Sequence, residues 1–175
     1  MGFALIFFIG LSFMLIIISI LLWIGYKHVG KPDIIKSIER EMDKMANNPE
    51  WDWIYVFIDL HGTVIKPNFI KGNTDVNYYP LALETLRLMS QADELRVCIY
   101  TSSHPDEIKG YAEQFEKDGI KIWYVNENPE VPNHGYGFYD KKPYFNILFE
   151  DKAGFFGETD WLPVYKYFKK RYGKK

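Results

Sequence analysis

Residues 56–63 decide the fold class, and they read Val56-Phe57-Ile58-Asp59-Leu60-His61-Gly62-Thr63. The first three are apolar and β-prone, as in a strand buried within a parallel sheet. Asp59 follows them, at the position where open α/β sheets bind ligands. Gly62 permits a sharp turn, and the hydroxyl of Thr63 can fix it. A plain strand, Asx-turn and loop is the alternative interpretation of this stretch taken alone.

Strand patterns alternate with helical patterns along the rest of the chain. Apolar runs predict strands over residues 56–58, 96–100, 120–125 and 146–149, and 3.6-residue periodicity predicts helices over 33–46, 80–93 and 105–118. A last amphipathic helix is predicted with Trp161, Tyr165, Phe168 and Tyr172 on its apolar face. Such alternation implies βαβ units with right-handed crossovers. The prediction is a Rossmann-like α/β fold with a parallel sheet covered by helices on both faces.

The first 26 residues contain no charged side chain. Residues 3–26 are almost continuously apolar, and at about 1.5 Å per residue they would cross a bilayer core. A signal peptide would need a basic start and a small-residue cleavage site, and neither is present. Lys27, His28 and Lys31 follow the span, so the positive-inside bias predicts a single-pass membrane protein with its C-terminal domain in the cytoplasm.

This organisation predicts three parts. Residues 1–26 form a transmembrane helix, residues 27–50 a juxtamembrane linker with an amphipathic helix, and residues 51–175 the α/β domain. The amphipathic helix could pack on the domain or lie on the membrane. All 21 basic and 23 acidic residues lie after position 26, so that part of the chain is nearly neutral. Its composition therefore does not predict a broad basic face for nucleic-acid binding. Cys98 is the only cysteine, which fits a reducing compartment.

Polar residues follow three of the predicted strands. Asp59 ends the first strand, Thr101-Ser102 the second and Glu150-Asp151 the fourth, while Lys142 lies shortly before the fourth. The carboxyl ends of parallel strands share one edge, so these groups should converge there. Acidic groups that converge need a cation, and a few hard oxygen ligands favour Mg²⁺. A lysine and hydroxyls beside it suit a phosphate group.

These segments together resemble the four motifs of the haloacid dehalogenase-like phosphatases. Residues 59–63 are similar to the first motif, Asp-x-Asp-Gly-Thr, and Thr101 to the second. Lys142 before Pro143 resembles the lysine of the third motif, and residues 147–153 resemble the acidic fourth motif. The resemblance covers about residues 53–160, and its strength lies in the order and strand placement of the four motifs.

The resemblance implies a Mg²⁺-dependent phosphohydrolase that acts on phosphate monoesters. Asp59 would be the residue that becomes phosphorylated. Mg²⁺ would be held by Asp59, Asp151 and the main-chain carbonyl of His61, with Glu150 as the further acidic residue. Lys142 would stabilise the nucleophile and the phosphate, which Thr101 and Ser102 would also bind.

His61 departs from the family pattern, because a second aspartate usually stands there as general acid and base. A histidine could shuttle that proton near neutral pH. The alternative is that the substitution abolishes turnover, which would leave a binding or scaffold module tethered at the membrane. A nucleotidase within the same fold is a third possibility.

The segments between the motifs are too short for a full cap domain, so an open site with residues 64–79 as a small flap is expected. The sequence shows no aromatic cage or base-reading cluster, so the substrate class stays open beyond a phosphorylated compound.

Overall fold

The computed structural model describes residues 14, 16–19, 33–48, 50, 52–68, 70 and 72–173. The chain divides into two compact units, Met1–Asp33 and Ile34–Lys175. The second unit contains the sheet, the residues of the predicted site and the amphipathic helix that had been predicted as juxtamembrane.

The prediction of a single-pass membrane protein is corrected by the structure. A spanning helix needs about 20 apolar residues. Among the residues that the structure describes, no helix combines that length with sufficient apolarity. Of the predicted span, Met14 and Ile16–Ser19 are helical, and the remainder of residues 3–26 lies outside the described residues. The structure therefore does not support the transmembrane assignment or the localisation derived from it.

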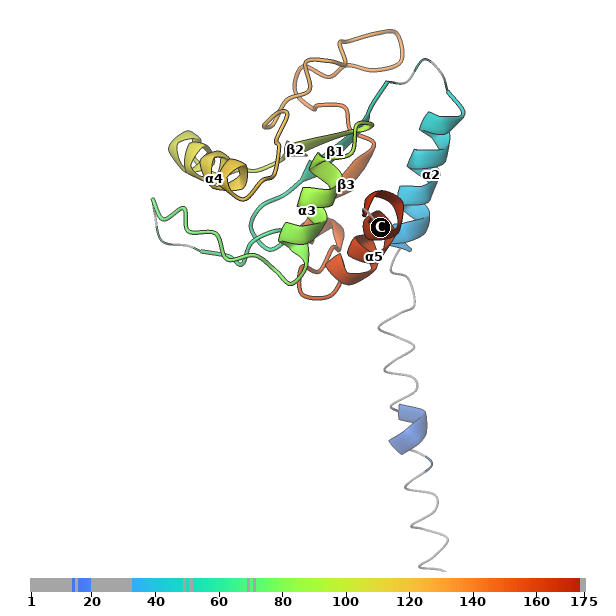
Figure 1. Ribbon diagram of the computed structural model, residues 1–175, viewed down its shortest axis with the longest axis vertical. Coiled ribbons are helices and arrows are strands. Elements are labelled where there is room, and N and C mark those ends of the chain that lie inside the picture. The colour runs from blue at the N-terminus through green and yellow to red at the C-terminus, as the bar shows by residue number, and fades with distance from the viewer. Residues whose placement is uncertain are drawn as a thin grey trace, which may run out of the picture. The chain divides into compact units, whose positions relative to one another are not determined.

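A three-stranded parallel sheet forms the centre of the second unit. It consists of β1 (Ile54–Ile58), β2 (Leu95–Ile99) and β3 (Ile147–Phe149), in the order β2-β1-β3 (Figure 1). Val56 lies opposite Val97 and Ile147. The parallel α/β architecture predicted from the sequence is thus present.

The strand predicted over residues 120–125 is only partly formed. The Trp123 amide donates to the Val97 carbonyl at 2.8 Å, and the Ile99 amide donates to the Tyr124 carbonyl at 2.9 Å. An isolated parallel bridge joins Ile99 to Val125. The segment therefore runs beside β2 and hydrogen-bonds to it without becoming a continuous strand.

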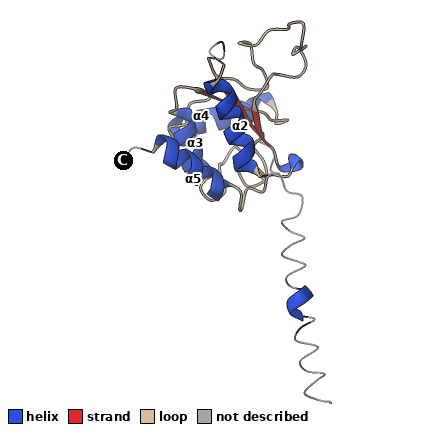
Figure 2. Cartoon of the chain, turned by 90° about the vertical axis from the view of Figure 1, so that its right-hand side faces the viewer, coloured by secondary structure: helices blue, strands red, loops and turns tan. Residues whose placement is uncertain are grey.

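Helices pack on one face of this sheet. They are α2 (Ile34–Ala46), α3 (Ala82–Ser90), α4 (Pro105–Lys117) and α5 (Trp161–Tyr172), with a 3₁₀ turn, η1, at Asp151–Ala153 (Figures 1 and 2). Their buried residues join one hydrophobic cluster with Val56 and Ile58 of β1. Ile38 of α2 is 1 % exposed within it, so the amphipathic helix packs on the domain.

Loop residues cover the other face, where helices had been predicted. Tyr55, Phe57 and Cys98 point to this face and form a second cluster. The partly buried residues that pack on it come from loops or from β3 itself: Trp53, Trp123, Tyr124, Val131, Tyr144, Phe145 and Leu148. The segment from 126 to 140 is rich in proline, glycine and asparagine, which disfavour helix. Burial raises the pKa of the Cys98 thiol to about 12.

Candidate active site

Asp59 is the first residue after β1. Its amide donates to the carbonyl of Phe149 at 2.9 Å, which holds the ends of β1 and β3 side by side. Glu150 and Asp151 follow β3 directly. Asp59, Glu150 and Asp151 each offer a carboxylate oxygen within 4.8 Å of the others. The structure therefore brings together three acidic residues that lie about 90 positions apart in the chain.

The turn after Asp59 is tight and depends on glycine. The amides of Val64 and Ile65 both donate to the Leu60 carbonyl at 2.9 Å. Gly62 has a φ of +88°, where other residues are strained. A Cβ placed on Gly62 would lie 2.6 Å from Oδ2 of Asp151. Glycine is needed here for two reasons, because the backbone is left-handed and because the turn closely approaches an acidic side chain.

Thr63 links three elements around the acidic residues. Its buried Oγ1 donates to Oδ2 of Asp59 at 3.3 Å and accepts from the Asp151 amide at 2.9 Å. Its carbonyl accepts from Nε1 of Trp161 at 2.8 Å. One threonine thus ties the turn after Asp59 to the 3₁₀ turn η1 and to the start of α5.

Thr63→Val is expected to destabilise the fold by about 1–3 kcal/mol, because the Asp151 amide loses its acceptor in a buried place. Thr63→Ser keeps the hydroxyl and is the matched control, with a smaller loss expected. Urea unfolding of both variants measures the difference. Equal stability of the valine and serine variants would show that the hydroxyl does not hold this turn.

The acidic residues shift one another's pKa values. Burial raises the pKa of Asp59 from 3.8 to about 6, and the neighbouring charges of Glu150 and Asp151 add to the effect. Burial also raises the pKa of Glu150. Three carboxylates at this spacing repel one another when ionised, and a hard divalent cation would relieve that repulsion. The donor set therefore fits Mg²⁺, with oxygen atoms as its ligands.

Lys152 supplies a cation beside this group, which the sequence interpretation had missed. Its Nζ lies 2.8 Å from Oδ1 of Asp151 and 3.9 Å from Oε1 of Glu150. The hydrogen bond from Lys152 lowers the pKa of Asp151, and the same bond raises the pKa of Lys152. The sequence feature that could have indicated this contact was the position of Lys152 directly after Glu150 and Asp151.

Lys142 is not joined to this group. Its side chain is exposed and makes no hydrogen bond or ion pair within the described part of the chain. It lies in the loop before β3, directly before the buried Pro143. The role implied for Lys142 by the family resemblance therefore remains a prediction.

Thr101 and Ser102 lie at the same sheet edge, beyond the end of β2. The Tyr100 amide donates to the Ile58 carbonyl at 2.9 Å, so this end adjoins the end of β1. The Thr101 amide donates to Oδ1 of Asn126 at 2.8 Å, and Nδ2 of Asn126 donates back to the Thr101 carbonyl at 2.7 Å. Ser102 is exposed. Asn126 is a supporting residue that sequence motifs alone did not indicate.

The His61 ring is directed to α4. Its Nε2 lies 3.0 Å from the hydroxyl of Tyr111, and the two rings meet edge to face. Burial lowers the pKa of His61; Glu107 opposes this, and Lys152 adds to it. The ring is therefore held at α4, and it is not part of the group formed by Asp59, Glu150 and Asp151.

Comparison with known proteins supports the α/β fold alone. No family model matches the chain, and no curated protein matches it. A solved structure described as a conserved protein coded by a locus from Bacteroides thetaiotaomicron superposes with a TM-score of 0.51 at 21 % sequence identity. The match covers 68 % of this chain and 92 % of that chain. At this identity the likeness shows a shared α/β fold.

Proposed function

We propose that this protein is a Mg²⁺-dependent phosphohydrolase of the haloacid dehalogenase-like type, acting on phosphate monoesters through an aspartyl-phosphate on Asp59. The supporting observation is the meeting of Asp59, Glu150 and Asp151 at one edge of a parallel sheet, with carboxylate oxygens within 4.8 Å. This is the edge at which open α/β sheets bind ligands.

Each residue has a distinct task in this reaction. A carboxylate oxygen of Asp59 attacks phosphorus, the ester P–O bond breaks, and the leaving oxygen takes a proton. Water then cleaves the aspartyl-phosphate and releases inorganic phosphate. His61 is the candidate to give the first proton and accept the second. Asp59, Glu150 and Asp151 would hold Mg²⁺, which neutralises charge on the phosphoryl oxygens.

The loop over residues 64–79 is the proposed small flap of a capless site. It is tied to α4 and the residue after it, because the Tyr78 hydroxyl donates to Asp118 at 2.7 Å and the Gly72 amide donates to Glu107 at 3.1 Å. A short loop in place of a cap domain leaves room for phosphate esters of different sizes. The proposal therefore specifies the reaction and the phosphate group, with the rest of the substrate open.

The second candidate is a catalytically silent binding module of the same fold. The observation that favours it is the His61–Tyr111 hydrogen bond of 3.0 Å, which directs the ring nitrogen to a tyrosine on α4. A histidine used only for packing would leave the acidic group without a proton donor.

A phosphatase assay on the full chain separates these candidates. We expect release of inorganic phosphate from a panel that includes p-nitrophenyl phosphate, with Mg²⁺ and not with excess chelator. Asp151→Asn should weaken Mg²⁺ binding in calorimetry and reduce activity together. Asp43→Asn removes an exposed carboxylate on α2, outside the acidic group and the proposed flap, and is the control. Unchanged Mg²⁺ affinity in Asp151→Asn would exclude that residue as a ligand.

Two lysines compete for the phosphate-stabilising role. Lys152→Ala is expected to reduce kcat/KM about 10- to 100-fold, as expected for loss of one charge-assisted hydrogen bond. Lys142→Ala should have the smaller effect, because Lys142 makes no contact with the acidic residues in the described structure. Steady-state kinetics of both variants decides the order. The opposite order would assign the role to Lys142.

A further inference from the structure

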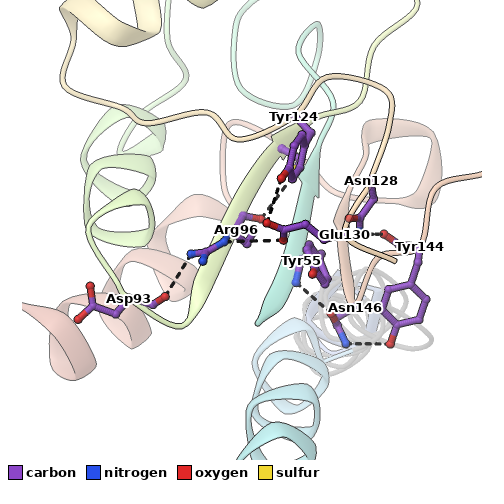
Figure 3. Close-up of polar contacts among 9 residues, drawn as sticks. Tyr55, Asp93, Arg96, Tyr124, Asn128, Glu130, Tyr144 and Asn146 are labelled. Carbon is purple, nitrogen blue, oxygen red and sulfur yellow. Dashed lines mark hydrogen bonds and ion pairs between the residues drawn. The ribbon is translucent and has the colours of Figure 1, made fainter. Parts of the chain in front are cut away.

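A second cavity lies at the opposite end of the sheet from Asp59. It has a volume of about 660 Å³ and is lined by Tyr55, near the start of β1, and by Asn146, just before β3. Figure 3 shows both residues with Tyr144 and Glu130, which also line it. Small-molecule sites commonly occupy cavities of about 300–1,000 Å³. This cavity is large enough for a ligand and is separate from the acidic group.

Aromatic side chains form walls that are held in place. Tyr144 meets Tyr55 edge to face at 6.3 Å between ring centres, and it meets Tyr139 in the same way at 5.6 Å. The Asn146 amide fixes two of these residues. Its Oδ1 accepts from the Tyr55 amide at 2.9 Å, and its Nδ2 donates to the Tyr144 hydroxyl at 3.1 Å (Figure 3). The cavity is therefore preorganised, with aromatic surfaces directed by a hydrogen-bonded network.

The charges on the lining all have one sign. Glu50, Asp52 and Glu130 contribute carboxylates, and the described lining includes no lysine or arginine. Aromatic faces attract cations through their quadrupole, most strongly where water is partly excluded. Aromatic walls with carboxylates beside them favour an organic cation and disfavour phosphates and other anions.

The protein already binds one such cation within its own chain. The Arg96 guanidinium lies 3.4 Å from the ring centre of Trp53 and 3.6 Å from that of Trp123. Its Nε lies 3.9 Å from Oε2 of Glu130 (Figure 3). Trp53 and Glu130 also line the cavity. Two residues that hold an internal guanidinium therefore face the space in which a second cation would lie.

We propose that this cavity binds a guanidinium cation, the head group of an arginine side chain. A planar guanidinium stacks on aromatic rings and pairs with carboxylates in a fork, which a lysine ammonium does not do equally well. The volume admits a whole capped arginine. The arginine can belong to a small free compound or to a peptide, and both present the same chemistry. This proposal is independent of the phosphohydrolase proposal.

Calorimetric titration of the full chain tests the ligand class, at constant ionic strength and with chelator present. N-acetyl-arginine amide is compared with the neutral isostere N-acetyl-citrulline amide and with the lysine analogue. We expect the arginine compound to bind about 3- to 30-fold more tightly than citrulline, the range of a cation–π contribution. A pentapeptide with arginine between glycines distinguishes the two sources. Tighter binding of the peptide indicates a peptide ligand, and equal or weaker binding indicates a small one.

Variants locate the binding in the cavity. Tyr139→Leu and Asp52→Asn should each weaken arginine binding at least about threefold. Tyr136→Leu and Glu127→Gln are the matched controls, because these exposed residues lie outside the lining. Asp52 is exposed, so its variant still tests the proposal if Tyr139→Leu fails to fold. Equal binding of arginine and citrulline compounds, or equal losses in variants and controls, would overturn the proposal.

Discussion

Asp59→Asn is expected to reduce turnover of a phosphate monoester by at least about 10³-fold, because an amide cannot attack phosphorus as the carboxylate does. The variant keeps the size of the side chain and can still accept the hydrogen bond from Thr63, so the fold should be retained. Phosphate release under saturating Mg²⁺ measures the loss. Retention of more than a few per cent of wild-type turnover would show that Asp59 is not the nucleophile.

The same variant has a predicted effect on stability whose sign follows from the raised pKa. Folding raises the pKa of Asp59 from 3.8 to about 6. The contribution of this pKa shift to the free energy of unfolding is fully present below pH 3.8 and is lost as the pH rises through 6. Above pH 6 the buried charge of Asp59 therefore lowers the free energy of unfolding by about 1 kcal/mol, after allowance for solvent screening.

Thermal unfolding should consequently show Asp59→Asn more stable than the wild type at pH 7.5 in the presence of chelator, and not at pH 4. Mg²⁺ should raise the midpoint of the wild type at pH 7.5 by binding the folded state, with a much smaller rise in the variant. If Mg²⁺ raises both midpoints equally, the ion does not bind at Asp59.

His61→Ala is expected to cost about 10²- to 10⁴-fold in kcat, the usual contribution of a general acid–base group. His61→Asp should keep or raise the rate, because it restores the residue usual in the family that this chain resembles. Tyr111→Phe is the structural control: it removes the hydroxyl 3.0 Å from the His61 ring and leaves the imidazole present.

The wild-type rate decides how these variants are interpreted. A wild-type chain inactive on every ester but active as His61→Asp would be a silenced member of the fold, and the binding-module alternative would stand. Loss of activity in His61→Ala with little change in Tyr111→Phe supports a chemical role for the imidazole. Equal losses in both variants would indicate that the histidine acts through packing on α4.

The strand and helix positions followed closely from sequence patterns. Buried β-branched and aromatic runs marked β1, β2 and β3, and helical periodicity marked α2 to α5 within about two residues, apart from the ends of α3. The segment 120–125 has the same apolar composition but forms only an isolated bridge. Edge segments are paired on one side, so local propensity alone does not decide whether they become strands.

The parallel α/β architecture and the convergence of Asp59, Glu150 and Asp151 could be predicted from the sequence, because the carboxyl ends of parallel strands lie at one edge of the sheet. Tertiary structure alone decided that Lys152 pairs with Asp151, that the His61 ring lies on Tyr111, and that aromatic loops replace helices on one sheet face. It also created the aromatic cavity, which the composition had not indicated. Such contacts join residues distant in sequence, and their partners are chosen by packing and by the need to satisfy buried polar groups.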